Sequence, residues 1–127
     1  MIPQANPRRV RLLTVNSTLH IGGAELVAAA LARNVDQQRF DSTACYLKQS
    51  GLVGEQMTSA GVDLIPVPGL TNGQTDYLSF RKLRRLIADR GIDVIHTHDV
   101  HGLVDGALCR LTLPHVRHLH TFHFGNY

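Results

Sequence analysis

The sequence predicts an α/β protein with a doubly wound, all-parallel sheet of five strands in the order 3-2-1-4-5. Short segments rich in apolar and β-branched residues alternate with helix-forming segments along the whole chain. Such alternation is typical of a parallel sheet with helices on both faces, and right-handed crossovers then leave few topologies. The chain has 127 residues, of which 43% are hydrophobic and 18% charged, which indicates one globular domain.

The expected elements follow one another in strict alternation. Strands are expected at residues 10–15, 40–47, 62–67, 92–95 and 116–122, and helices at residues 24–35, 53–60, 78–90 and 102–111. Pro66 in the third strand favours an edge position, because proline cannot donate to a sheet ladder. The third helix is amphipathic, with Leu83, Leu86 and Ile87 on its apolar face, and Gly91 ends it.

In this topology the strand order reverses between the first and fourth strands. Ligands of open parallel sheets bind beyond the carboxyl ends of the strands, at such a reversal. The loops over residues 16–23 and 96–102 follow these two strands. We therefore expect the two loops to meet and to form the functional site.

The first of these loops ends in the glycine pair Gly22 and Gly23, directly before a helix. Glycines let the backbone approach a ligand closely, and the positive end of a helix dipole favours an anion such as phosphate. A plain tight turn explains the glycines equally well. Neither the dinucleotide fingerprint nor a P-loop is present. Glu25, in the first turn, either complements the dipole or contacts the ligand.

The second loop is unusually rich in histidine, with the sequence H-T-H-D-V-H over residues 96–101. It is close to the H-x-H-x-D-H ligand pattern of metal-dependent hydrolases, and two imidazoles one residue apart can bind one zinc ion. However, that pattern requires an aspartate at position 100, which is Val100. We therefore expect His98 and Asp99 to face a ligand and His96 to be a buried histidine bonded to backbone, and we expect no metal ligands.

The last predicted strand also carries several histidines. Alternation along a strand places His118 and His120 on one face and Leu119 on the other. His123 follows the strand end, near the same rim as His98, and is the best placed of the late histidines to bond a substrate. A surface histidine is the alternative.

The remaining composition excludes several classes of function. The net charge of +3 comes with a basic cluster at Arg81, Lys82, Arg84 and Arg85, which is either a solvated helix face or a contact for anionic lipid. No aromatic residues interleave this cluster to stack on bases, so nucleic acid is disfavoured.

Cys45 and Cys109 lie in apolar surroundings and are expected to be buried, reduced thiols. No Ser-His-Asp or Cys-His pair is recognisable, and Ser17 lies in no nucleophile elbow.

Four short motifs together resemble the N-terminal domain of family 4 retaining glycosyltransferases, which have the GT-B fold. They are I-G-G-A-E over residues 21–25, S-G-L at 50–52 with the Gly61-Val62 pair after it, D-V-I-H-T-H at 93–98, and H-T-F-H at 120–123. Their order and spacing match, and they cover nearly the whole chain. The resemblance implies a Rossmann-like domain that mainly binds the acceptor, while a C-terminal domain binds most of the nucleotide-sugar donor.

The resemblance also implies roles for individual residues. Gly22 and Gly23 correspond to the loop that approaches the donor diphosphate and the acceptor. His98 corresponds to a position in the loop that lines the acceptor cleft. His123 corresponds to the histidine that contacts the transferred sugar or diphosphate, with His120 as the second candidate. Members of the family need no bound metal, so no cofactor is expected.

Residues 1–127 are thus expected to be a partial N-terminal domain that lacks its donor domain and is inactive alone. The expected partners are a nucleotide-sugar donor, a sugar or lipid acceptor, the missing C-terminal domain and a second copy that buries the fifth-strand edge. The expected location is the cytoplasm, with peripheral contact at the inner membrane face. The alternatives are a zinc-dependent hydrolase using His96, His98 and His101, and a non-catalytic Rossmann-like assembly module.

Overall fold

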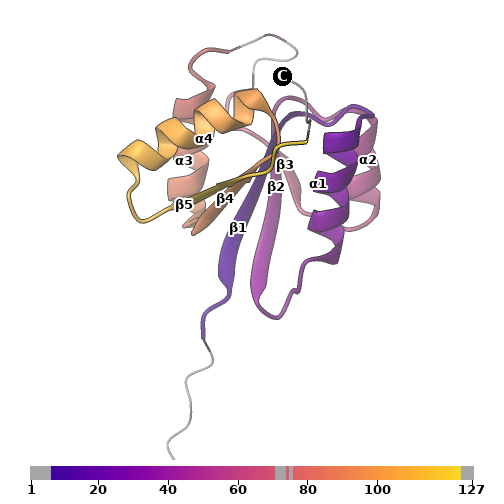
Figure 1. The fold of residues 1–127 in the computed structure, drawn as a ribbon, viewed down its shortest axis with the longest axis horizontal. Helices are drawn as coiled ribbons and strands as arrows, with labels where there is room; N and C mark the ends of the chain where they lie inside the picture. The colour runs from indigo at the N-terminus through magenta and orange to yellow at the C-terminus, as the bar shows by residue number, and fades with distance from the viewer. Residues whose placement is uncertain (1–6, 71–73, 75, 124–127) are drawn as a thin grey trace, which may run out of the picture.

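The computed structural model describes residues 7–70, 74 and 76–123 (Figure 1). Strands and helices alternate in this part of the chain, as the sequence predicted. They are β1 (Val10–Thr18), α1 (Gly23–Asn34), β2 (Phe40–Gln49), α2 (Gly51–Ser59), β3 (Leu64–Pro66), α3 (Ser79–Arg90), β4 (Val94–Thr97), α4 (Val100–Thr112) and β5 (Arg117–His120).

The five strands form one parallel sheet in the order β3-β2-β1-β4-β5, which confirms the predicted fold class and strand order. The labels in Figure 1 can be followed across the sheet in this order. Strand β3 lies at one edge and contains Pro66, as expected for a residue without a backbone N–H. The order reverses between β1 and β4, so the carboxyl ends of these two strands are neighbours.

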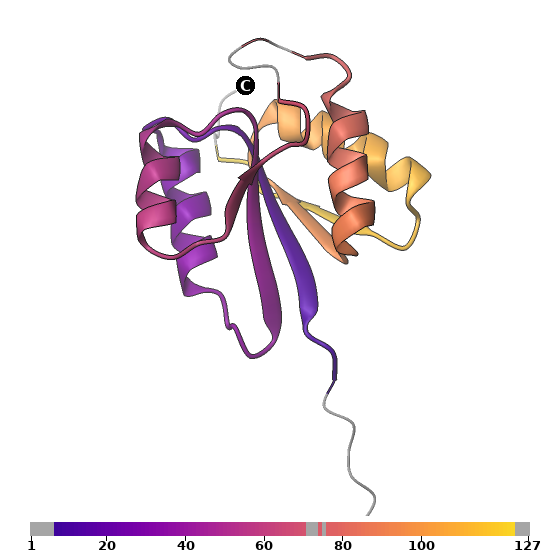
Figure 2. The same ribbon diagram turned by 180° about the vertical axis from the view of Figure 1, so that it is seen from behind.

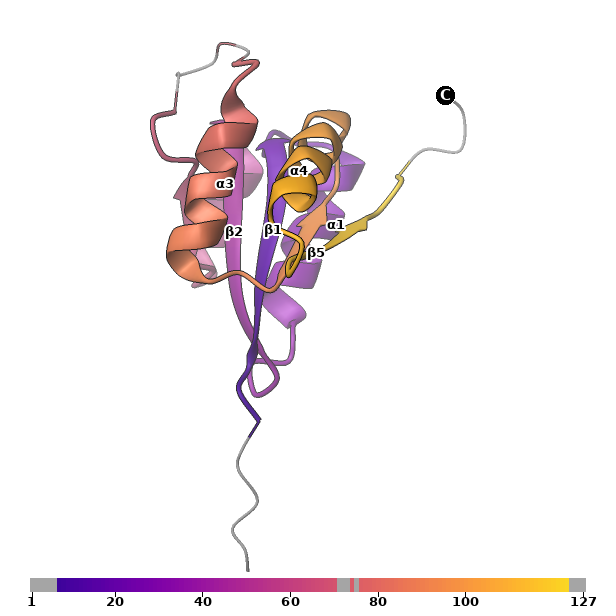
Figure 3. The same ribbon diagram turned by 90° about the vertical axis from the view of Figure 1, so that its left-hand side faces the viewer.

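Two helical layers enclose the sheet. Helices α1 and α2 lie on one side and α3 and α4 on the other, as the front and back views show (Figures 1 and 2). The side view shows α3 and α4 side by side (Figure 3). Because side chains alternate along a strand, β1 sends Leu13 and Val15 into the core beneath α3 and α4. Beneath α1 and α2 lies a second, smaller core that includes Ala29, Val53 and Met57.

Several element boundaries near the predicted site differ from the sequence-based expectation. The expected first strand ended at residue 15, but β1 continues to Thr18, and the expected fifth strand ran over residues 116–122, but β5 is Arg117–His120. The expected fourth strand ended at residue 95, but β4 continues to Thr97, because Thr14 of β1 pairs with His96 and Val15 with Thr97. The expected fourth helix began at residue 102, but α4 begins at Val100, because Asp99 caps it. His96 therefore lies within a strand and His101 in the first turn of a helix, and neither is a loop residue.

Other expectations about the elements are confirmed. Gly91 has the left-handed conformation (φ 61°) that ends α3, and Leu83, Leu86 and Ile87 are buried. Cys45 and Cys109 are free, buried thiols, and burial raises the pKa of each to about 12. Among the described residues, no helix combines the length and the apolar character needed to cross a membrane.

Candidate functional site

The segments that follow β1 and β4 meet, as predicted, and Asp99 joins the end of β1 to the start of α4. Its Oδ2 accepts a hydrogen bond from the Ser17 backbone N–H (2.5 Å), and its Oδ1 accepts one from the Gly102 N–H (2.7 Å). The second bond makes Asp99 the N-cap of α4. Both carboxylate oxygens thus bond backbone groups, and the side chain fixes the start of α4 against the end of β1.

A cavity of about 560 Å³ opens at this edge of the sheet. Its lining is Gly22, Gly23, Ala24, Glu25, His98, Asp99, Val100, His120 and Phe122. The structure therefore brings together six residues that the sequence singled out from three separate segments. Val100 and Phe122, both 66% exposed, add apolar wall that the sequence analysis did not assign to the site.

The glycine pair lies at the N-terminus of α1. Gly22 is the N-cap, in an extended conformation, and no side chain within the described residues caps the helix. The first N–H groups of α1 are therefore not used by a capping side chain at the mouth of the cavity. A methyl group at Gly23 would meet no atom within 4 Å, whereas one at Gly22 would meet the flexible carboxylate of Glu25.

His98 is buried, only 3% exposed, and forms part of the cavity wall. Its Nδ1 lies 3.0 Å from Nε2 of His123, which confirms the expectation that His123 reaches the same rim. Its Nε2 is buried and has no hydrogen-bond partner among the described residues. Burial, followed by the nearby imidazole of His96, lowers the pKa of His98 to about 3. His98 is therefore a neutral hydrogen-bonding group at physiological pH.

His96 lies behind His98, with the two ring centroids 4.1 Å apart. It is buried, as expected, but its Nε2 bonds Oγ1 of Thr121 (2.7 Å) and not a backbone group. Burial lowers the pKa of His96. His96 therefore supports the cavity wall from behind.

The histidines of β5 are arranged as the predicted alternation of side chains along the strand requires. His118 and His120 both bond Oγ1 of Thr97, each at 2.8 Å, so they share one face of β5. His120 also lines the cavity and packs edge-to-face against Phe122, with centroids 4.5 Å apart. Burial lowers the pKa of His120.

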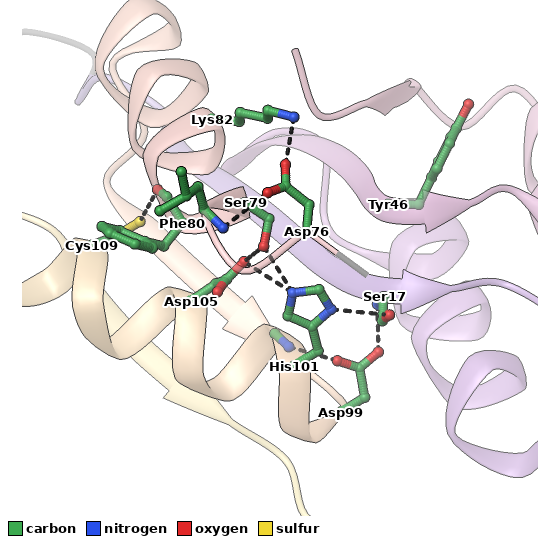
Figure 4. Close-up of polar contacts among 12 residues, drawn as sticks. Ser17, Tyr46, Asp76, Ser79, Phe80, Lys82, Asp99, His101, Asp105 and Cys109 are labelled. Atoms are coloured by element: carbon green, nitrogen blue, oxygen red, sulfur yellow. Dashed lines mark hydrogen bonds and ion pairs between the residues drawn. The ribbon is translucent and has the colours of Figure 1, made fainter. Parts of the chain in front are cut away.

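His101 does not join His96 and His98, which removes the geometry of the zinc alternative. Its ring points away toward α3, where Nε2 lies 2.8 Å from Ser79 Oγ and 3.4 Å from Asp105 Oδ2 (Figure 4). No group of three or more histidine, cysteine, aspartate or glutamate side chains in the described ranges could hold a metal ion. The part of the chain that the structure describes gives no support to the zinc-dependent hydrolase.

The sequence analysis missed the polar cluster around His101, in which Ser17 has a histidine partner. Ser17 Oγ lies 3.3 Å from His101 Nδ1 (Figure 4). The spacing of His101 and Asp105, four residues apart on a helix, was a usable signal for their contact. Ser79 gave no such signal, because it reaches the cluster from a different helix.

Comparison with known proteins agrees with the observed fold. The sequence profile of Glycosyltransferase Family 4 matches residues 21–127. No curated protein matches the chain. Among solved structures, a glycosyltransferase from Rickettsia africae ESF-5 is similar, with a TM-score of 0.66 and 13% sequence identity. The match covers 95% of this chain and 31% of that protein, so these 127 residues span about a third of its length. At this identity the likeness shows the fold alone.

Proposed function

Because this chain belongs to Glycosyltransferase Family 4, we propose that it is the acceptor-side half of an enzyme that transfers a sugar from a nucleotide-sugar donor. In this proposal a second domain completes a GT-B arrangement and binds most of the donor. The chain alone binds the acceptor and approaches the donor diphosphate, but does not catalyse transfer.

One observation carries the proposal. The same cavity is lined by the N-terminus of α1 and by His98, a buried histidine whose Nε2 has no hydrogen-bond partner among the described residues. The N-terminal N–H groups of α1 and the adjacent Gly22 and Gly23 suit a diphosphate, because the helix dipole favours an anion there. A buried polar atom without a partner is costly, so a ligand oxygen that bonds His98 Nε2 relieves that cost.

The histidine pair has a simple role in this scheme. His98 stays neutral, and its Nδ1 contact fixes the ring of His123 at the end of β5. In this proposal His123, which is not among the lining residues of the cavity, contacts the transferred sugar, and His120 in the cavity wall is the second candidate. Asp99 acts by holding the two loops together, because both of its oxygens bond backbone N–H groups.

Replacement of Gly23 by alanine tests the diphosphate position. The added methyl group meets no protein atom within 4 Å, so we expect the fold to be unchanged. It does occupy space at the mouth of the cavity, and we expect it to weaken pyrophosphate binding about tenfold, or about 1.4 kcal/mol. The measurement is an NMR titration of the isotope-labelled chain with pyrophosphate, in which the amides of residues 22–25 should shift.

The matched control is Ser59→Ala, a change on the exposed surface of α2 that should leave the titration unchanged. Equal binding by wild type and Gly23→Ala, or shifts confined to residues far from the cavity, would contradict the proposal.

A second titration uses nucleotide sugars with and without an added donor domain. A large gain on adding that domain supports the transferase, and equal binding counts against it.

We further propose that the enzyme contacts a membrane surface peripherally through α3. Arg81, Arg84 and Arg85 are exposed on this helix, and the exposed apolar residues Tyr77 and Leu78 precede it. Cationic side chains beside exposed apolar ones are typical of helices that lie on anionic lipid.

A further inference from the structure

His101 connects three elements at the carboxyl edge of the sheet. From the first turn of α4, its Nδ1 faces Ser17 of β1 at 3.3 Å, and its Nε2 faces Ser79 of α3 at 2.8 Å. Asp105, one turn further along α4, bonds the Ser79 hydroxyl and lies 3.4 Å from His101 Nε2. Figure 4 shows the imidazole between the two serines.

The buried half of this cluster fixes the proton on one ring nitrogen. Ser79 and Asp105 are 1% and 4% exposed, and Ser79 Oγ donates its only hydrogen to Asp105 Oδ2. Ser79 Oγ can therefore only accept from His101, so Nε2 of His101 must carry a hydrogen. The neutral ring then has an unprotonated Nδ1.

The other half of the cluster responds to the charge of the ring. When His101 is neutral, its unprotonated Nδ1 accepts a hydrogen bond from the Ser17 hydroxyl. Because Ser17 Oγ has then donated its only hydrogen, it can only accept further hydrogen bonds. When His101 is charged, Nδ1–H donates to Ser17 Oγ, and the serine hydrogen is released. The backbone of Ser17 is held in both states, because its N–H donates to Asp99.

We infer that His101 is a positioning residue whose proton decides whether the Ser17 hydroxyl, at the end of β1 beside the cavity-lining residue Asp99, offers lone pairs or a hydrogen. With His101 neutral, the Ser17 hydroxyl can only accept a further hydrogen bond. With His101 charged, it can donate one. The inference concerns the edge where sugar transfer is proposed, but it rests on the hydrogen bonds alone.

The charges around His101 set the pH at which this change occurs. Asp105 and Asp99 of α4 face it, Asp76 approaches from the segment before α3, and Lys48 of β2 opposes them. The hydrogen bond to Asp105 raises the pKa of His101, against the effect of burial. The change in Ser17 therefore falls above the ordinary histidine value of about 6.5.

The test is an NMR titration of the isotope-labelled 127-residue chain between mildly acidic and alkaline pH, without any ligand. Long-range nitrogen–hydrogen correlations report which ring nitrogen of His101 is protonated in the neutral form. We expect the hydrogen on Nε2, a midpoint above about 6.5, and a shift of the Ser17 β-carbon with the same midpoint. A neutral ring with its hydrogen on Nδ1 would overturn the inference.

Three variants separate positioning from a general structural effect. His101→Gln should abolish the pH-dependent shift of Ser17, and Asp105→Asn should lower the His101 midpoint. The matched control, His115→Gln, removes an exposed histidine and should change neither. A Ser17 shift that persists in His101→Gln contradicts the inference. The tautomer measurement on wild type decides the case if a variant does not fold. Since no sugar donor is used, the outcome is independent of the proposed transferase activity.

Discussion

At the scale of single residues, Asp99 shows how one side chain can organise a site through bonds to backbone groups. The sequence placed it in a loop and suggested a ligand-facing carboxylate. In the structure its oxygens accept from the N–H groups of Ser17 and Gly102. One bond caps α4 and the other holds the end of β1, so Asp99 sets the spacing between the loops that line the cavity.

Replacement of Asp99 by alanine should lower the free energy of unfolding by about 2–3 kcal/mol. The lost helix cap accounts for about 1 kcal/mol of this, and the lost charged hydrogen bond to Ser17 for the rest. Asp99→Asn keeps one acceptor oxygen and should cost less. Urea unfolding of both variants measures the difference.

The control for this pair is Asp89→Ala. Asp89 forms an exposed 3.8 Å ion pair with Arg85, so its loss should cost less than about 1 kcal/mol. If Asp99→Ala lowered the free energy of unfolding by no more than Asp89→Ala does, the two bonds from Asp99 to backbone N–H groups would not stabilise the site as described.

At the scale of elements, α3 combines a buried stripe with a basic outer face. Leu83, Leu86 and Ile87 pack into the core, and this arrangement follows from their spacing along the helix. The cations of the predicted basic cluster are not all equally free to contact anionic lipid. Lys82 bonds Asp76 and the Gly69 carbonyl, whereas Arg81 is exposed.

Removing two arginines from α3 tests the proposed membrane contact. Each cation near an anionic surface contributes about 1 kcal/mol, so Arg81→Ala with Arg85→Ala should weaken binding to phosphatidylserine vesicles about 30-fold. Vesicle sedimentation at low salt measures this. The matched control removes Arg33 and Arg39, which lie outside α3, and should change binding much less. Equal losses in the two double variants would show only a general charge effect.

At the scale of the whole molecule, β5 forms one edge of the sheet. Within the described residues, β5 pairs only with β4, and Leu119 on this strand is 55% exposed. An unpaired strand edge with an apolar side chain favours association. We propose that a second copy of this chain covers the edge.

Sedimentation velocity over a range of concentrations tests that proposal. We expect a dimer that Leu119→Glu abolishes, because the substitution places a charge in the interface. Leu52→Glu, at a residue of similar exposure (46%) on α2, should leave the dimer intact. A chain that stays monomeric at the highest concentration would show that the proposed dimer is wrong.

Much of this molecule was predictable from local pattern. The alternation of strand and helix segments, joined to the handedness of crossovers, gave the sheet order and placed β1 beside β4. That adjacency was enough to bring Gly22, His98 and His120 into one cavity. It also placed His123 beside His98, because the end of β5 lies at the same edge.

The sequence by itself thus determined the fold and the edge of the sheet where the site lies, because side-chain periodicity and crossover handedness are properties of neighbouring residues. Only the tertiary structure decided that His101 faces α3 and Ser17 and does not join His98 at the cavity. His98 lies at the end of β4 and His101 in the first turn of α4, and the Asp99 cap separates them. The serine partners of His101, which are Ser17 and Ser79, and the burial that keeps His98 neutral come from segments distant in the chain. No local pattern encodes those contacts, because they exist only after the layers have packed.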